Sequence, residues 1–430
     1  MKTIPSLVAI IALAISSSVV AKTTVIHAGE LLAVPGDKPL KEQTVVIKDG
    51  KIINVVKGYA EATKFGKNAQ LIDLSDRFVM PGLMDMHVHL QGELSPSNDS
   101  EALRMSNADV AMKSTMFANK VLHAGFTTVR DLGANPEEIF ALRDAIDKGW
   151  VNGPRVIAAG SMVAATGGHG DVDGMKAELI EKYTPKTICD GPYDCRRATR
   201  HAIKYGADII KITSTGGVLS DTNTGTGQQM TDDELVEIVE TAHGLGRKVT
   251  SHAHAAAGIN AALRAGVDSI EHGSYADEES IRLFKENGAY LVPTLLAGDT
   301  VVNLAKNSNF MSDAIKAKAI RVGADMIANF KRSYEAGVNI AFGTDSGVSK
   351  HGINAREAVL MANAGMRNSD ILKSATVNAA DLIDMSASLG TIESGKIADI
   401  VAYDESPLKN IEALLDVDFV MKDGKVHKQK

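Results

Sequence analysis

The chain has 430 residues, 44% of them hydrophobic, and a formal net charge of -7 at pH 7. This length allows one large domain and a smaller one, and the hydrophobic content supports a substantial core, which excludes a disordered chain. The acidic balance and the lack of a basic run in the sequence argue against a nucleic-acid-binding protein.

Residues 1–21 have the pattern of a secretory signal peptide. Lys2 provides a short positive start, an apolar stretch from Leu7 to Ile15 follows, and small residues end at Ala21. We expect cleavage after Ala21 and export to the periplasm or the cell exterior. The alternative is an uncleaved membrane anchor, but the apolar stretch is shorter than the about 20 residues of a comfortable bilayer span. No other segment predicts stable membrane insertion.

Residues 22–80 and 388–430 share a strand-rich character. Strand-like runs flank Asp49-Gly50, a dipeptide that favours a hairpin turn, and the runs Asp399–Tyr403 and Phe419–Val426 repeat this style. Neither terminal piece is large enough to bury a core alone. We therefore predict that the two pieces pair into one small, discontinuous β-sandwich domain.

Between these flanks, residues 81–387 alternate short apolar or β-branched runs with longer helix-compatible runs. Eight candidate strands separated by helices predict an α/β fold, a closed (β/α)₈ barrel of the TIM type. The segment Thr231–Glu234 predicts a capping box at the start of the helix after the fourth strand. The candidate strands are Leu83–His89, Thr127–Asp131, Arg155–Ala159, Ile209–Thr213, Lys248–His252, Ser269–His272, Tyr290–Pro293 and Ile340–Asp345.

His87 and His89 close the first candidate strand. Side chains on a strand repeat their direction every second residue, so both imidazoles leave the same face and can bind one cation. Taken alone, this pair is equally well explained as a chance pair of polar residues. The carboxyl ends of other strands, where barrels of this type place their chemistry, supply more donors: Lys211, His252, His272 and Asp345.

Together, these donors predict a centre with two divalent metal ions. Four imidazoles and a carboxylate suit zinc or a similar ion, but two ions need more negative oxygen than Asp345 provides. Lys211 provides it if its amine has reacted with carbon dioxide, because the resulting carbamate is a bridging carboxylate rather than a cation. The alternative is an ordinary lysine paired with an acid. Four histidines and Asp345 at matching strand ends favour the ligand interpretation over this alternative.

The two cysteines, Cys189 and Cys195, flank the turn-rich segment Asp190–Asp194. In an exported protein such neighbours can form a small disulfide loop, whereas two thiols alone cannot complete a zinc site. We favour the disulfide over two free thiols.

These motifs resemble those of the amidohydrolase superfamily. Within it, the chain most resembles the imidazolonepropionase-like branch, which contains zinc carboxypeptidases of the Xaa-Lys/Arg or Xaa-Pro type that act on dipeptides and N-acyl amino acids. The resemblance covers nearly the whole mature chain and is specific for fold and metal chemistry, but much less so for substrate. The matching segments are His87-Val-His89, Gly125–Asp131, Ala165–His169, Ile210-Lys211-Ile212, Thr215–Val218, His252-Ala-His254, Ile270-Glu-His272-Gly and Gly343-Thr-Asp345-Ser.

The resemblance implies that a hydroxide between two metal ions attacks the substrate and that Asp345 moves the proton from the attacking water to the leaving amine. His169, in a loop after two glycines, is a candidate substrate contact or a solvated histidine. His254 is a candidate substrate contact, a competing ligand or the first residue of a helix. Arg130 either pairs with a substrate carboxylate or forms a structural ion pair with an acid such as Asp131. His351, which follows the eighth strand, is a weaker candidate for a substrate contact.

The segment after the seventh strand, Thr294–Leu304, bears on the substrate. An enzyme that removes a basic C-terminal residue needs an acidic pocket, but this segment is mostly apolar with only Asp299 acidic, so cleavage before an apolar residue is at least as well supported.

We expect an exported hydrolase that cuts the amide bond before a C-terminal amino acid in dipeptides or N-acyl amino acids. The alternatives are a cyclic-amide hydrolase, which the same metals would serve, and a non-catalytic barrel, which normally lacks such ligands. A homo-oligomer is compatible with the sequence.

Overall fold

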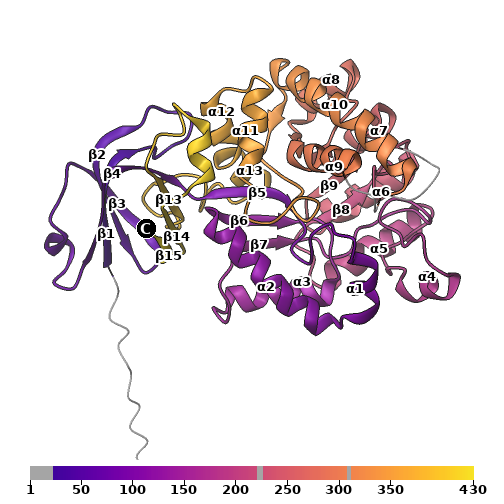
Figure 1. Ribbon diagram of the computed structural model, residues 1–430, viewed down its shortest axis with the longest axis horizontal. Helices are drawn as coiled ribbons and strands as arrows, with labels where there is room; N and C mark the ends of the chain where they lie inside the picture. Colours follow the sequence, from indigo (N-terminus) through magenta and orange to yellow (C-terminus); the bar gives the residue numbers. More distant parts are fainter. Residues whose placement is uncertain (1–22, 220–225, 308–310) are drawn as a thin grey trace, which may run out of the picture.

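The computed structural model of the protein describes residues 23–219, 226–307 and 311–430. The expected signal peptide, residues 1–21, lies outside these ranges. Figure 1 shows a strand-rich domain on the left and a larger domain of strands and helices on the right. Within the described ranges, no helix combines the length and apolar character needed to cross a membrane.

Strands from both ends of the chain form the smaller domain. They make one seven-stranded sheet in the order β15-β14-β13-β4-β1-β2-β3, and its apolar core combines residues of both ends, such as Val45 and Phe419. The shorter segments η1 (Ala62–Phe65) and η2 (Ile411–Leu415) are 3₁₀ turns. The strands are β1 (Thr23–Leu31), β2 (Leu40–Lys48), β3 (Lys51–Lys57), β4 (Gln70–Pro81), β13 (Ile400–Tyr403), β14 (Phe419–Lys422) and β15 (Lys425–Gln429).

The two terminal pieces were predicted to pair into one β-sandwich, and their strands are joined in a single sheet. β4 is parallel to β1 on one side and antiparallel to β13 on the other, so hydrogen bonds run continuously from the amino-terminal to the carboxyl-terminal strands. Because one strand serves both groups, the terminal pieces share a single sheet as well as a core.

Each of the eight predicted strands of the larger domain has a counterpart in the described chain. The strands belong to a three-stranded sheet, β5-β6-β7, and a five-stranded sheet, β12-β11-β10-β9-β8, both parallel. They are β5 (Leu83–Val88), β6 (Phe126–Asp131), β7 (Arg155–Ala158), β8 (Ile210–Thr213), β9 (Val249–Ala253), β10 (Ser269–His272), β11 (Tyr290–Val292) and β12 (Asn339–Ile340).

Backbone hydrogen bonds cross both gaps between these two sheets. The N–H of Val163, after β7, donates to Lys211 O on β8 at 2.8 Å, and the N–H of Met86 on β5 donates to Phe342 O, after β12, at 2.8 Å. These are the contacts that the expected closed barrel requires at its two seams.

The eighth strand ends earlier than predicted. β12 stops at Ile340, and the chain continues irregularly to Asp345, whose φ of 55° lies in the left-handed region and is incompatible with a strand.

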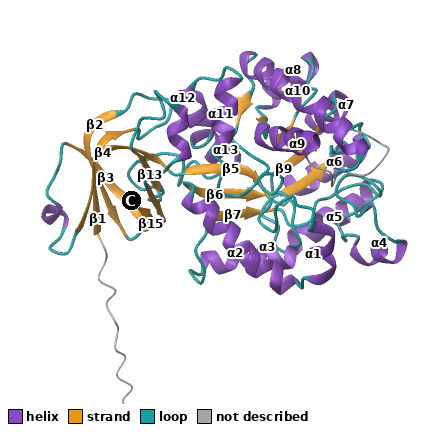
Figure 2. Ribbon diagram, in the orientation of Figure 1, coloured by secondary structure: helices purple, strands orange, loops and turns teal. Residues whose placement is uncertain are grey.

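Helices pack outside the strands of the larger domain (Figure 2). α6 begins where predicted, since the carboxylate of Glu234 accepts the backbone N–H of Thr231 at 2.8 Å. The helices are α1 (Asn98–Arg104), α2 (Asn107–His123), α3 (Pro136–Asp147), α4 (Ala177–Tyr183), α5 (Pro192–Lys204), α6 (Asp232–Gly244), α7 (Ala256–Ala265), α8 (Glu278–Asn287), α9 (Leu295–Asn307), α10 (Asp313–Glu335), α11 (Arg356–Asn363), α12 (Asn368–Ser374) and α13 (Val377–Leu382).

Candidate metal centre

The carboxyl ends of several strands open into one cavity of about 190 Å³. The six predicted metal ligands all line this cavity, and His169 and His254 line it with them. These ligands are His87, His89, Lys211, His252, His272 and Asp345.

His87 at the end of β5 and His89 just after it converge on Asp345. His87 Nε2 and His89 Nε2 lie 3.5 and 3.1 Å from Asp345 Oδ1. The other nitrogen of each ring forms a hydrogen bond on the side away from Asp345. His87 Nδ1 lies 2.8 Å from Glu271 Oε2, and His89 Nδ1 lies 2.8 Å from Gly133 O. These contacts determine which nitrogen of each ring faces the cavity.

Three more histidines form a second group at the ends of β9 and β10. The ring centroids of His252, His254 and His272 lie 4.6 to 5.0 Å apart. His254 Nδ1 is 2.7 Å from Ser274 Oγ, and His272 Nδ1 is 2.7 Å from Thr294 Oγ1. Hydrogen bonds to neighbouring hydroxyls therefore orient two of the three rings.

The donor atoms suit metal ions. One ligand atom from each of His252, His254 and His272 lies within 4.8 Å of the other two, and the same holds for His87, His272 and Asp345, so His272 belongs to both groups. Asp345 Oδ1 is buried and has no partner with hydrogen-bonding geometry among the described residues. A buried carboxylate oxygen in this state is costly unless a cation binds it, and imidazole and carboxylate are zinc ligands.

Burial keeps most of these histidines neutral. It lowers the pKa of His87 to about 4 and the pKa of His254 to about 3, and it holds the pKa values of His252 and His272 well below the ordinary range. At His89, burial is outweighed by the carboxylate of Asp345, which raises the pKa. Neutral imidazole is the form that binds a metal ion.

Lys211 is 2% exposed, and burial lowers the pKa of its amine to about 8 although Glu271 and Asp345 favour the charged form. A lowered pKa leaves a larger share of the amine neutral, which is the form that reacts with carbon dioxide. The position of Lys211 in the same cavity as Asp345 is therefore suited to the carbamate expected from the sequence.

His169 reaches the cavity from the loop after β7. Its ring centroid lies 4.2 Å from that of His252, and burial lowers its pKa to about 4. Gly217 packs so closely against the ring that a Cβ there would lie 2.5 Å from it. His169 thus lies where a substrate contact was expected.

Comparison with known proteins assigns this centre to a family. The sequence model of the amidohydrolase family matches residues 78–427. The chain belongs to the amidohydrolase family.

Several relatives of this amidohydrolase are known. An Xaa-Pro dipeptidase, solved with bound methionine in its active site, is 40% identical and has a TM-score of 0.89 over 95% of this chain and 100% of that chain. Ochratoxinase from Aspergillus niger is 34% identical over 97% of this chain and 89% of its own length. Imidazolonepropionase from Fusobacterium nucleatum is 24% identical over 84% of each chain. The resemblance seen in the sequence is confirmed, and the amidohydrolase is an enzyme that hydrolyses amide bonds.

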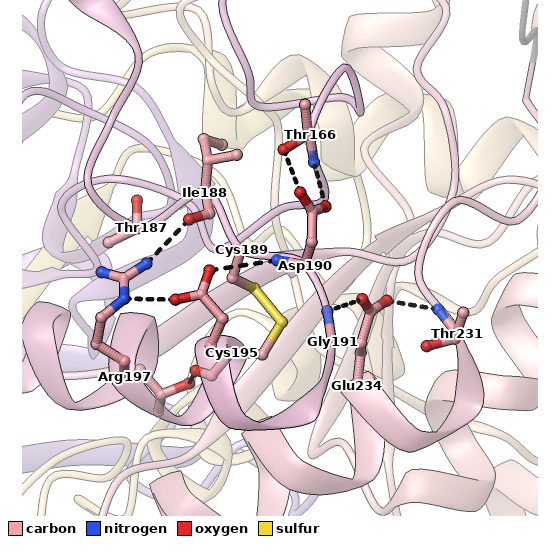
Figure 3. The surroundings of a disulfide bond; sticks show 12 residues. Thr166, Thr187, Ile188, Cys189, Asp190, Gly191, Cys195, Arg197, Thr231 and Glu234 are labelled. Carbon is pink, nitrogen blue, oxygen red and sulfur yellow. Dashed lines mark hydrogen bonds and ion pairs between the residues drawn. A yellow bond between two sulfur atoms is a disulfide. The ribbon is translucent and has the colours of Figure 1, made fainter.

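The loop that carries His169 is tied to a disulfide in this amidohydrolase. Cys189 and Cys195 are bonded to each other. Asp190, between them, accepts hydrogen bonds from the Thr166 N–H at 3.2 Å and the Thr166 hydroxyl at 2.7 Å (Figure 3). Since Thr166 lies three residues before His169, the disulfide loop supports the wall of the cavity.

Arg130 does not face the cavity. Its side chain is completely buried and donates to Met86 O at 2.6 Å, to Ser269 Oγ at 3.1 Å and to Glu271 Oε1 at 2.7 Å. The alternative of a contact with a substrate carboxylate is therefore wrong, because each of the three guanidinium nitrogens has a partner inside the protein and the side chain does not line the cavity. The structural ion pair is the correct alternative, with Glu271 rather than Asp131 as the acid.

His351 and Asp299 also lie away from the cavity lining. His351 Nε2 is 3.0 Å from Gly92 O, and its ring packs 4.7 Å from the ring of Phe117. Apart from Asp345, no acidic side chain lines the cavity in the described part of the chain. A basic substrate side chain would therefore lack a dedicated partner.

Glu271 is a functional residue that sequence analysis missed. It is completely buried and connects His87 to Arg130 through its two oxygens. Burial opposes its ionisation, but the charge of Arg130 and the hydrogen bond from His87 hold its pKa below the ordinary range. Alternation along a strand would place Glu271 and His272 on opposite faces, so a metal ligand at His272 did not suggest a role for Glu271. In the structure, His272 has a φ of 72° and leaves the strand conformation. The sequence feature that could have identified Glu271 is an acidic residue inside the short strand Ser269–His272.

Proposed function

We propose that this amidohydrolase is exported and uses two divalent metal ions to cleave the amide bond before a C-terminal amino acid in dipeptides or N-acyl amino acids. The observation that carries this proposal is the composition of the cavity. Imidazoles, Lys211 and Asp345 line it together with apolar side chains of α9 and α10. One side is suited to hydrolysis and the other to an amino acid side chain.

The donor set indicates which residues would hold the ions. Zinc fits the imidazoles and carboxylate, and carboxylated Lys211 would supply the bridging oxygens. Bound ions of this kind lower the pKa of water and polarise a carbonyl group. The proposed ligands are His87, His89, Lys211, His252, His272 and Asp345, with His254 close enough to His252 and His272 to replace one of them.

Asp345 is the proposed proton carrier. In the metal-free protein with an unmodified Lys211, burial opposes its ionisation, but His87, His89 and the Lys211 amine lower its pKa, so the carboxylate is unprotonated at neutral pH. It can accept a proton from the attacking water and pass it to the leaving amine, because the two steps follow each other. A single carboxylate is sufficient for both.

His169 and His254 are the proposed substrate contacts. Each is a neutral imidazole in the cavity wall with one N–H. His254 can donate to a carbonyl or carboxylate oxygen of the substrate through Nε2 when its Nδ1 accepts the hydroxyl of Ser274. The methionine in the active site of the related Xaa-Pro dipeptidase supports an amino acid as the occupant of this cavity.

A substrate screen tests the proposal. Zinc-loaded protein is offered dipeptides, N-acyl amino acids and cyclic amides, and the released amino acid or opened ring is measured. We expect release of the C-terminal amino acid from the first two classes. Activity confined to cyclic amides would instead assign the enzyme to the imidazolonepropionase type. For export, we expect the protein in the periplasmic or secreted fraction to begin at Lys22, which amino-terminal sequencing detects.

A further inference from the structure

The cavity has a wall without charge. One part follows β8, and the larger part belongs to α9 and α10, which pack against each other. Among the described lining residues, every titratable side chain belongs to the metal side or to His169. The uncharged wall includes Val218, Leu219, Ala297, Val301, Val322 and Met326.

Gly298 controls the space in front of this wall. It lies on α9 and lines the cavity, and a Cβ there would be 3.1 Å from Sδ and 3.5 Å from Cε of Met326 on α10. Because Gly298 and Met326 both line the cavity, an added methyl group occupies space beside Met326 and requires this flexible side chain to shift by a few tenths of an ångström. A larger residue at position 298 therefore reduces the space for a ligand.

Gly323, the other glycine of this wall, has a different role. A Cβ there would lie 2.3 Å from Cγ2 of Val302, a β-branched side chain that has little freedom to turn away. Gly323 is thus needed for the packing of α9 against α10. Gly298 is the position where the volume of the cavity can change while the two helices keep their contact.

We propose that the wall of α9 and α10 is the subsite for a large apolar side chain of the amino acid released by hydrolysis, and that Gly298 determines specificity by setting the depth of this subsite. Amide hydrolysis before that amino acid rests on the proposed function. A basic side chain would lose its water without gaining an acidic partner on this wall. Phenylalanine, leucine and methionine are the expected occupants.

Kinetics on N-acetyl derivatives of alanine, leucine, phenylalanine and lysine test the subsite. We expect wild-type kcat/KM to be higher for leucine and phenylalanine by about tenfold or more. Gly298→Ala should lower kcat/KM for the phenylalanine derivative by about tenfold and change the alanine derivative little. Equal losses on all derivatives, or no loss on phenylalanine, would overturn the proposal.

Gly244→Ala is the matched control. It makes the same chemical change at the end of α6, where a Cβ meets nothing within 4 Å, and we expect its kinetics to equal those of the wild type. Alanine is a better helix former than glycine, so Gly298→Ala should unfold at the wild-type temperature or above it. The loss of activity then reports volume rather than misfolding.

Calorimetric titration of L-phenylalanine and L-alanine into the zinc-loaded protein separates the subsite from turnover. We expect phenylalanine to bind more tightly than alanine to the wild type and to lose this advantage in Gly298→Ala. If the wild type hydrolyses neither dipeptides nor N-acetyl amino acids but shows this binding pattern, the proposed function fails and the subsite stands. If the wild type binds the two amino acids equally, the subsite is overturned.

Discussion

Asp345 combines two tasks at one carboxylate, and a change to asparagine separates them. Asp345→Asn keeps an oxygen that can bind a metal ion but cannot accept a proton. We expect kcat to fall by about 10²- to 10⁴-fold while most of the metal is retained. Steady-state kinetics and metal analysis of the same preparation measure both. Asp299→Asn, on α9 outside the cavity lining, is the control and should be unaffected. Near-normal turnover of Asp345→Asn would remove the proton-carrier role.

Glu271 holds a metal-facing histidine and a buried arginine at the same time. In Glu271→Gln, Arg130 loses its partner, and breaking a buried pair in this way costs about 3–5 kcal/mol of unfolding free energy. The hydrogen bond that orients His87 is also weakened, so zinc affinity should fall by about 10- to 100-fold. Urea unfolding and competition with a zinc chelator measure the two effects.

The matched control for this change is Glu237→Gln. Glu237 pairs with Arg196, whose side chain is 37% exposed, so the loss should be about 0–1 kcal/mol. A Glu271→Gln protein that is destabilised but binds zinc normally would show that Glu271 acts on stability alone.

The same residue predicts a pH dependence. The pKa of Glu271 in the folded protein lies below its ordinary value of 4.5, so its stabilising contribution is fully present above that value and is lost as the pH falls. The stability difference between wild type and Glu271→Gln should therefore shrink on acidification. Unfolding curves at pH 7 and at about pH 4 test the sign.

The sequence was sufficient to predict which donor residues meet in one cavity, but not the contacts that support them. His87, His89 and Asp345 were found because strand ends and residue type are visible in the sequence. The partners of Arg130 could not be found in this way, because Glu271 is distant from Arg130 in the sequence and contacts it only in the interior of the folded domain.

At the scale of elements, the disulfide loop links two segments that the chain order separates. On one side Asp190 accepts hydrogen bonds from Thr166, and on the other the Gly191 N–H donates to Glu234 near the start of α6 at 2.6 Å (Figure 3). The loop therefore connects α6 to the segment that carries His169. Its rigidity should influence how well this histidine is placed.

Replacing both Cys189 and Cys195 by serine tests this link. Removal of so short a cross-link should cost about 2 kcal/mol of unfolding free energy. We expect faster hydrogen exchange in residues 164–169 and a higher KM with a smaller change in kcat. Asp190→Asn, which keeps the disulfide and weakens the contact to Thr166, distinguishes the cross-link from the anchor. Unchanged exchange in 164–169 would mean that the bond does not hold this loop.

Element positions were largely predictable, and the exceptions have local causes. Apolar runs and the capping box located the strands and α6. The eighth strand was predicted to extend to Asp345, which is too far, because residue types do not reveal the left-handed backbone at Asp345. The single sheet of the small domain was missed because the sequence does not show that β4 has a partner on each side.

At the scale of the whole molecule, Arg155 joins the two domains. It lies on β7 and pairs with Asp399 at 2.8 Å and with Asp423, both from the small domain. The Arg155 side chain is 13% exposed and that of Asp399 is 6% exposed, so the pair is shielded from water. Loss of the arginine would leave a buried carboxylate without its charge partner.

We expect Arg155→Met to lower the unfolding free energy by about 3 kcal/mol. Arg77→Met is the control within the small domain, because Asp404, one of the partners of Arg77, is 83% exposed. It should cost about 0–1 kcal/mol. Differential scanning calorimetry compares both with the wild type. Equal melting temperatures for the two variants would show that the domain contact does not depend on this ion pair.

The order of strands in the small domain also governs when the chain can fold. Pro81 pairs with Ile400, and the sheet is completed only by β15, which ends at Gln429. As a nascent chain leaves the ribosome, one edge of β4 lacks its neighbour until Ile400–Tyr403 has been made, after the whole of the larger domain. Pairings between such distant segments form slowly, and unpaired edges attract incorrect partners. The small domain therefore cannot complete its sheet before the strands that follow the larger domain in the sequence have been synthesised.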